Sequence, residues 1–271
     1  MNESMDDILS ECISTLKPYL DQLVLAGGWV PYVYSKMYKD TVVQEPLFTR
    51  DFDAVVPRQG FKESETSLND LIKRAGYKYE FASISNPPVV KYVKTLADDM
   101  KVEIEFITDE PGNREGVREI GSINAQALRN VGILMDDPWG LDLAEHSLEE
   151  DGILLVPRPA TYLLHKALVA PKRRKREKTA KDLYYLFYVL EAFPLWKAET
   201  LTQLGELASS KKKLAGVAGR YLDSAFSNID SKGVDLIVSQ RPQTAFPDMT
   251  EDQFRQYVLF TINELIKSLR N

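Results

Sequence analysis

The chain is poor in the residues that build sulfur and imidazole metal sites. Cys12 is the only cysteine among 271 residues, and His146 and His165 are the only histidines. An intrachain disulfide therefore cannot form, and neither a thiolate zinc site nor a histidine-rich metal site is available. Any bound metal must be held mainly by carboxylates, which favours Mg²⁺ or Mn²⁺.

Long apolar runs are also missing. The longest, residues 23–34, contains Gly27, Gly28 and Pro31, and it is shorter than the roughly 20 apolar residues of a membrane-spanning helix. The acidic N-terminus has no basic segment followed by an apolar one, as a secretory signal would. We therefore expect a cytoplasmic protein with no membrane partner.

Positive charge is in deficit as well. Lys and Arg number 34 against 40 Asp and Glu, a net charge of −6, so the surface as a whole is not that of a general nucleic-acid binder. The glycine-rich phosphate motifs G-x-x-x-x-G-K-[ST] and G-x-G-x-x-G are both absent. With 44% hydrophobic and 27% charged residues, the composition is still that of a globular protein.

The two parts of the chain differ in their secondary-structure pattern. Hydrophobic periodicity predicts helices at 5–20, 29–38 and 67–75, and strands at 22–26, 49–56, 77–82, 89–93, 101–108, 131–135 and 152–156. After Pro159 nearly all of the chain reads as helix, with breaks near Pro194, Gly233 and residues 241–247. This pattern predicts an α+β fold, with a small mixed sheet in a domain of residues 1–157 and a helical bundle in residues 158–271.

A double glycine ends the first predicted strand. Gly27 and Gly28 stand between that strand and a helix starting at Trp29. Glycines at such a junction let the backbone approach a ligand, and the helix amides beyond them favour phosphate. The alternative is a tight turn with no ligand.

Two aspartates share one face of the next strand. Asp51 and Asp53 alternate with apolar Phe52 in residues 49–56, and their side chains lie about 7 Å apart along the strand. Two carboxylates on one face repel each other unless a cation lies between them, and strands disfavour aspartate. The pair therefore indicates a metal site, unless this is an exposed edge strand with solvated acids.

A further acidic strand follows. Glu103 and Glu105 share one face of residues 102–107, which alone is typical of an ordinary half-exposed strand. Double glycine, D-x-D and a later strand acid together form the set needed for transfer of a nucleotidyl group to a hydroxyl. Two cations about 3.5–4 Å apart can stabilise the attacking and leaving oxygens of that reaction.

These motifs resemble the polymerase-β-type nucleotidyltransferase superfamily, and within it the bacterial branch of AbiEii-like toxins and uncharacterised nucleotidyltransferases. The resemblance covers roughly residues 20–195 and includes residues 156–166 and 178–184. The superfamily usually has Gly-Ser where this chain has Gly27-Gly28, so a serine contact to phosphate is absent. The pattern favours Glu105 as the third acid, although Glu103 shares its face.

The resemblance implies catalytic and metal-binding roles for Asp51, Asp53 and Glu105, and nucleotide contacts for Gly27 and Gly28. It also implies that Lys166 and Lys181 bind the phosphates of the NTP, with Asp182 orienting Lys181. We expect the Lys166 ammonium to extend into a cleft; the alternative is a solvated helix face. RNA, including tRNA, or a protein side chain is the expected acceptor, and an antitoxin-like protein is an expected partner.

A rival interpretation is a non-catalytic member of the same fold that binds a nucleotide or a partner protein. An unrelated α+β interaction protein with solvated acids is a further alternative. The intact D-x-D motif speaks against both of these alternatives.

Overall fold

The computed structural model describes residues 5–40, 42, 44, 46–47, 49–81, 89–96, 100–112, 115–146, 148 and 151–270. Contacts between residues divide the chain into two compact units. The N-terminal unit comprises Met1–Met37 and Phe48–Arg158, and the helical unit comprises Tyr38–Leu47 and Pro159–Asn271.

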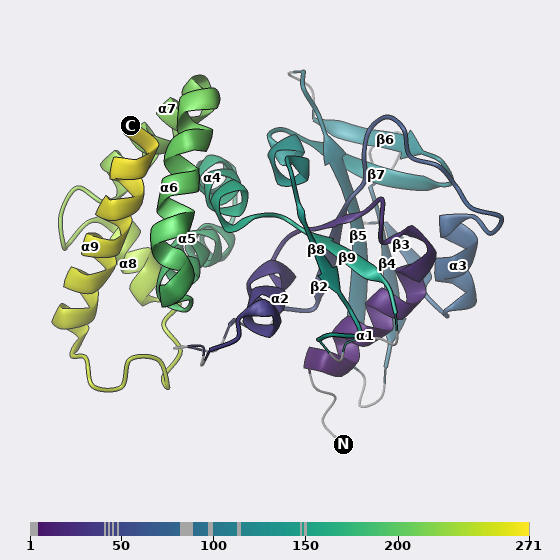
Figure 1. The fold of residues 1–271 in the computed structure, drawn as a ribbon, viewed down its shortest axis with the longest axis horizontal. Helices are drawn as coiled ribbons and strands as arrows, with labels where there is room; N and C mark the ends of the chain where they lie inside the picture. Colours follow the sequence, from purple (N-terminus) through teal and green to yellow (C-terminus); the bar gives the residue numbers. More distant parts are fainter. Residues whose placement is uncertain are drawn as a thin grey trace. The chain divides into compact units, whose positions relative to one another are not determined.

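The core of the N-terminal unit is a sheet that has nine strands within the described residues (Figure 1). The strands are β1 (Val24–Leu25), β2 (Asp51–Val55), β3 (Lys78–Phe81), β4 (Val90–Thr95), β5 (Lys101–Asp109), β6 (Gly116–Ile120), β7 (Ile123–Leu128), β8 (Trp139–Asp142) and β9 (Ile153–Val156). The main order is β3-β4-β5-β2-β1-β9-β8, and the β6–β7 hairpin joins through β7 to β5. Parallel and antiparallel pairs both occur, so the sheet is mixed.

Strand β2 is an inner strand. It pairs in parallel with β5 along its whole length and antiparallel with β1 at its end, where Val24 faces Val55 and Leu25 faces Ala54. Its apolar residues explain this position, because Phe52 and Ala54 are each only 1% exposed. The alternative of an exposed edge strand is therefore wrong.

Helix α1 covers one face of this sheet. The helices of the N-terminal unit are α1 (Met5–Leu16), α2 (Trp29–Met37) and α3 (Leu68–Arg74), with short 3₁₀ turns η1 (Lys17–Tyr19) and η3 (Val131–Met135). Glu11 of α1 binds Lys94 of β4 with an Oε1–Nζ distance of 2.6 Å, and Lys94 is in register with Val102 on β5. Since side chains alternate along a strand, α1 lies on the face of Val102 and Phe106 rather than on that of Glu103 and Glu105.

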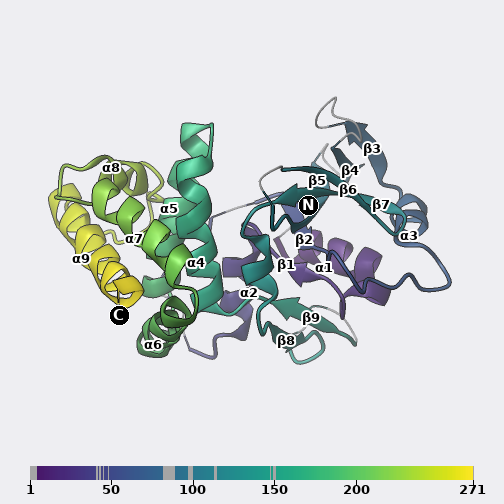
Figure 2. The same ribbon diagram turned by 90° about the horizontal axis from the view of Figure 1, so that it is seen from above.

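The helical unit is built from six α-helices in its described residues (Figure 2). They are α4 (Pro159–Val169), α5 (Arg176–Glu191), α6 (Pro194–Ser210), α7 (Lys212–Ala225), α8 (Lys232–Val238) and α9 (Glu251–Arg270), with the 3₁₀ turn η4 (Ala170–Lys172) after α4. Helix α5 packs against α4 and α8, and α9 packs against α6 and α7. No helix in the described part of the chain is both long and apolar enough to cross a bilayer.

Residues 38–47 group with the helices, although they precede the D-x-D strand in the sequence. The Tyr38 ring packs edge-on against Phe193 and Trp196, and its hydroxyl accepts a hydrogen bond from the Leu195 amide at 3.0 Å. The helical unit thus includes a segment that the predicted domain of residues 158–271 does not contain.

The predicted α+β class is confirmed, but one predicted strand is wrong. Residues 131–135 form η3 rather than a strand. Asn130 has a left-handed backbone with φ 67°, and the Gly132 amide donates to Asp109 Oδ1 at 2.8 Å. These contacts turn the chain where apolar composition alone indicates an extended segment.

The sequence pattern also missed strands β6, β7 and β8 and the interruption between α6 and α7 at Lys211. Strand β7 alternates regularly between buried and half-buried residues. Its side chains include Ala125, Gln126 and Ala127, and alanine has a low strand propensity. Pairing with β5 and β6 overrides this propensity.

Candidate active site

Four carboxylates lie in register on two neighbouring parallel strands. Asp51 pairs with Glu103, and Asp53 pairs with Glu105. Paired residues on adjacent strands point to the same face, about 4.8 Å apart between strands and about 7 Å apart along each strand. Asp51 is exposed and the other three are half-buried, so this acidic face reaches solvent.

The double glycine lies directly against this face. Gly27 has φ +67°, in the left-handed region, and a Cβ atom at this position would collide with Asp53 Oδ2 and lie 2.9 Å from Asp53 Cγ. The Ala26 amide also donates to the Asp53 carbonyl at 2.8 Å. Glycine is therefore required here, because it lets the backbone before α2 approach the second aspartate. Gly28, which follows, is buried.

A lysine that the sequence pattern did not single out lies beside both glutamates. Lys91 of β4 donates to Glu103 Oε1 at 2.7 Å, and it is the register partner of Glu105. The hydrogen bond to Glu103 and the nearby Glu80 and Glu105 charges raise the pKa of Lys91. Glu103 is thus engaged in an ion pair on the same face that carries Glu105.

The acidic face fits cations that also take ligands from a substrate. Within the described residues, no three His, Cys, Asp or Glu side chains are arranged as a ready-made metal cage. Mg²⁺ commonly takes one or two carboxylates and completes its shell with water and substrate phosphates. The four carboxylates carry like charges on one face, and a cation bound by them would neutralise their repulsion.

The predicted phosphate-binding lysines lie in the helical unit. Lys166 on α4 is only 3% exposed, and its Nζ donates to Asp182 Oδ1 on α5 at 2.7 Å. The ammonium lies 5.3 Å from the ring centroids of both Tyr162 and Tyr185. The expectation of an ammonium extending into a cleft is therefore wrong, and so is the alternative of a solvated face.

Asp182 joins two cations. Its second oxygen, Oδ2, accepts from Arg173 Nε at 2.6 Å. Burial raises the pKa of Asp182, but the Lys166 and Arg173 charges outweigh burial and lower it overall. Lys181, the neighbour of Asp182 in sequence, has its ammonium 5.8 Å from the centroid of the Tyr185 ring. The Asp182 carboxylate thus binds both Lys166 and Arg173.

Residue His165, next to Lys166, is buried with one ring nitrogen unsatisfied. It is 7% exposed, and its Nδ1 has no hydrogen-bond partner among the described residues. Burial, reinforced by the Lys166 charge, lowers the pKa of His165 to about 3. The folded protein therefore keeps this imidazole neutral, whereas the unfolded chain protonates it near its ordinary pKa of about 6.5.

Stability should consequently fall as pH drops below about 6.5. The unfolded chain binds the proton and the folded protein does not, so the free energy of unfolding loses roughly 2 kcal/mol between pH 7.5 and pH 5. We expect urea unfolding to show this loss in the wild type and much less of it in His165→Phe. His146→Gln, which changes the only other histidine, should keep the full loss. An equal loss in His165→Phe would contradict the assignment to His165.

The sequence did not predict two of these ion pairs, Lys91–Glu103 and Arg173–Asp182. Lys91 lies opposite Glu105 only because β4 pairs antiparallel with β5 in one register. Arg173 belongs to an exposed basic stretch, residues 172–178, whose composition is typical of a solvated connector. For Lys91, the one available sequence signal was its alternation with buried Val90 and Tyr92. Alternation indicates only which face of the strand a side chain lies on, not its partner.

The mixed sheet and the helices define this protein as an α+β protein. Its candidate active site is the acidic face of β2 and β5, beside the strand–glycine–helix junction at Gly27 and Gly28. The chain belongs to a nucleotidyltransferase family, because the family model described as Nucleotidyltransferase matches residues 9–203. The match includes both acidic strands, the double glycine and helices α4 and α5. Transfer of a nucleotidyl group, with a nucleotide as substrate, is therefore the general activity of this family.

Comparison with curated proteins found no match to this chain. Among solved structures, the chain is similar to an antigenic nucleotidyltransferase-like protein from Paracoccidioides brasiliensis. The two share 15% sequence identity over 78% of this chain and 92% of the other, with a TM-score of 0.37. A likeness at that level adds nothing to the family assignment.

Proposed function

We propose that this protein transfers a nucleoside monophosphate from an NTP to a hydroxyl group, with Mg²⁺ or Mn²⁺ held by Asp51, Asp53 and Glu105. The observation that carries the proposal is the register of β2 with β5, which places Asp53 beside Glu105, with Asp51 on the same face. Glu103 is the weaker candidate for the third acid, because Lys91 already binds it.

Each residue of the acidic face has its own role in the proposed reaction. Bound cations supply charge neutralisation for the attacking oxygen and for the departing pyrophosphate. Asp51 and Asp53 hold the cations from one strand, and Gly27 leaves room for the Asp53 carboxylate beside the backbone. Glu105 would hold the cation on the acceptor side, or it would take the proton of the attacking hydroxyl as the bond to the leaving pyrophosphate breaks.

The nature of the acceptor rests on the resemblance to the AbiEii-like branch. That resemblance supports RNA, including tRNA, or a protein side chain as the acceptor, and an antitoxin-like protein as a partner. Lys166 and Lys181 are proposed to favour the NTP phosphates through their positive charge. Because Lys166 is engaged with Asp182, a phosphate contact from its ammonium requires exchange of that ion pair.

Transfer of label tests the proposal and the third acid together. The protein should move label from an α-³²P-labelled NTP to RNA or protein of a total extract, and EDTA should abolish the transfer. Glu105→Gln should lose far more activity than Glu103→Gln, because Glu103 is neutralised by Lys91 and Glu105 adjoins Asp53. Absence of transfer with every NTP would favour the non-catalytic alternative, and a greater loss in Glu103→Gln would reverse the assignment of the third acid.

A further inference from the structure

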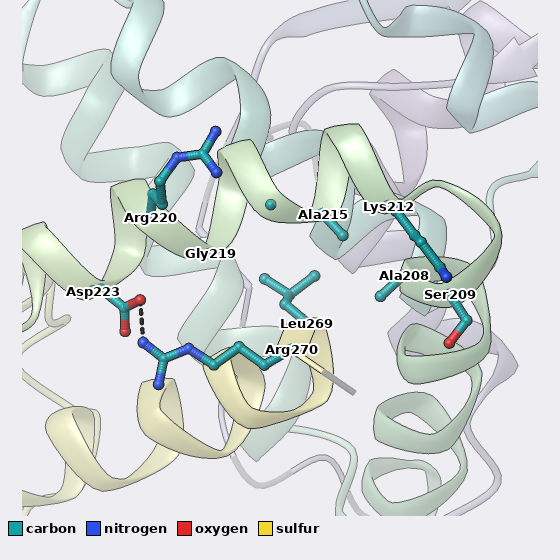
Figure 3. A pocket seen from close by; sticks show the side chains of 10 residues that line it. Ala208, Ser209, Lys212, Ala215, Gly219, Arg220, Asp223, Leu269 and Arg270 are labelled. Carbon is teal, nitrogen blue, oxygen red and sulfur yellow. Dashed lines mark hydrogen bonds and ion pairs between the residues drawn. The ribbon is translucent and has the colours of Figure 1, made fainter.

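A pocket of about 440 Å³ lies within the helical unit (Figure 3). It is bounded by the end of α6, one face of α7 and the last residues of α9. Its volume falls in the range of roughly 300–1,000 Å³ that is typical of sites for small ligands. None of the residues predicted to act in nucleotidyl transfer lines it.

The face of α7 that lines the pocket carries two basic side chains with small residues between them. Its lining residues are Lys212, Ala215, Gly216, Gly219, Arg220 and Asp223. Spacings of three and four residues place all six on one side of the helix. Figure 3 shows Lys212 and Arg220 toward opposite ends of this face, with Leu269 of α9 between them.

Gly219 is the feature that points to an occupant. Glycine is a poor helix former, second only to proline, and Gly219 lies in the interior of α7. A Cβ atom added there would meet no heavy atom within 4 Å, whereas one at Gly205 of α6 would lie 3.6 Å from the Ser268 carbonyl oxygen. Packing therefore does not require glycine at position 219. The missing side chain keeps the pocket open at the expense of helix stability.

The charge of the pocket indicates what it holds. Arg270 forms an ion pair with Asp223, the one carboxylate in the lining. Among the described residues, Lys212 and Arg220 form no ion pair. A Cβ atom at Gly216 would lie 3.4 Å from Arg220 Nη1, so the guanidinium folds back over a glycine of the pocket floor. The lining thus carries two positive charges in excess, within a chain of net charge −6.

We propose that this pocket binds a phosphate-bearing ligand of about mononucleotide size. Arg220, whose guanidinium lies over Gly216 of the pocket floor, contacts the phosphate as a charged hydrogen-bond donor, and Lys212 adds positive charge at the other end of the pocket (Figure 3). The ligand's body lies on Gly219 and on the apolar side chain of Leu269. A free nucleotide and one phosphate-linked residue of an RNA strand share this chemistry. The proposal does not depend on nucleotidyl transfer by the N-terminal unit.

Glycine-selective ¹⁵N labelling gives a readout confined to the pocket. The chain has 14 glycines, and Gly216 and Gly219 report on the pocket floor while Gly27 and Gly28 report on the acidic face. Single Gly→Ala variants assign the signals. The full chain is titrated in EDTA with AMP, and separately with a single-stranded RNA of about ten nucleotides.

Saturable shifts at Gly216 and Gly219 are expected with at least one of these probes, with Gly205 unmoved. Shifts with AMP identify a free nucleotide, and shifts only with RNA identify a strand. No shift at either glycine with millimolar probe would overturn the proposal. EDTA removes the cations that the acidic face is proposed to need, and signals from Gly27 and Gly28 report separately on any binding there, so this titration tests the pocket alone while label transfer with Mg²⁺ tests the proposed function.

Two variants separate binding from folding. Arg220→Gln should weaken binding by roughly tenfold or more, which is the effect of losing one charged hydrogen bond, whereas Lys267→Gln on α9, outside the pocket lining, should not. Gly219→Leu should abolish binding because it fills the pocket, yet its melting temperature should be at least that of the wild type. Gly205→Ala is the matched helix-glycine control. Retained binding in Gly219→Leu would overturn the proposal.

Discussion

Asp53→Asn should lower the rate of nucleotidyl transfer by at least about a hundredfold, while the fold stays intact. Asn has nearly the size of Asp, so the close approach of Gly27 is preserved. It lacks the negative charge that holds a cation against developing charge on the transferred phosphate, and losing such electrostatic stabilisation typically costs a factor of 10² to 10³ or more. Turnover of a labelled NTP under saturating Mg²⁺ measures this effect.

The same substitution has a signature that does not depend on activity. Removing one of four carboxylates in register relieves repulsion, so the metal-free melting temperature should stay equal or rise. Mg²⁺ with NTP should raise the melting temperature of the wild type but not of Asp53→Asn, because a ligand stabilises only the state that binds it. Glu119→Gln removes an exposed acid of β6 and should change neither result. An active Asp53→Asn protein would refute the proposed metal site.

Asp182→Asn should destabilise the protein by roughly 3–5 kcal/mol. Asp182 has a side chain only 5% exposed, and it binds both Lys166 and Arg173. Arg173 is 35% exposed and can turn to water, but Lys166 is 4% exposed and would be left as a buried charge without its counterion. Removing one partner of a buried ion pair costs about this much because the remaining charge stays desolvated. Urea unfolding measures the loss.

The origin of that loss is testable with a double variant. Lys166→Met combined with Asp182→Asn removes the buried charge and should recover much of the stability lost in the single variant. Asp223→Asn, which breaks the exposed pair with Arg270 in the same unit, should cost less than about 1 kcal/mol. If the double variant is no more stable than Asp182→Asn, repacking rather than an unpaired charge explains the effect.

Local patterns in the sequence were enough to locate the acidic strand. Alternation in a strand has a period of two, so Asp51 and Asp53 necessarily share a face wherever residues 51–55 are extended. The scarcity of cysteine and histidine limited metal ligands to carboxylates, and helical periodicity after Pro159 predicted the bundle. Each of these inferences depends only on residues within a few positions of one another.

Strand register and side-chain packing were decided by the tertiary structure. Asp53 lies beside Glu105, Glu105 lies opposite Lys91, and Gly27 lies against Asp53 because strands distant in sequence pair in one register. A shift of one residue would turn every side chain to the other face, and nothing local to either strand specifies that choice. Burial of Lys166 likewise follows from the packing of α4 on α5, which brings Asp182 to its ammonium.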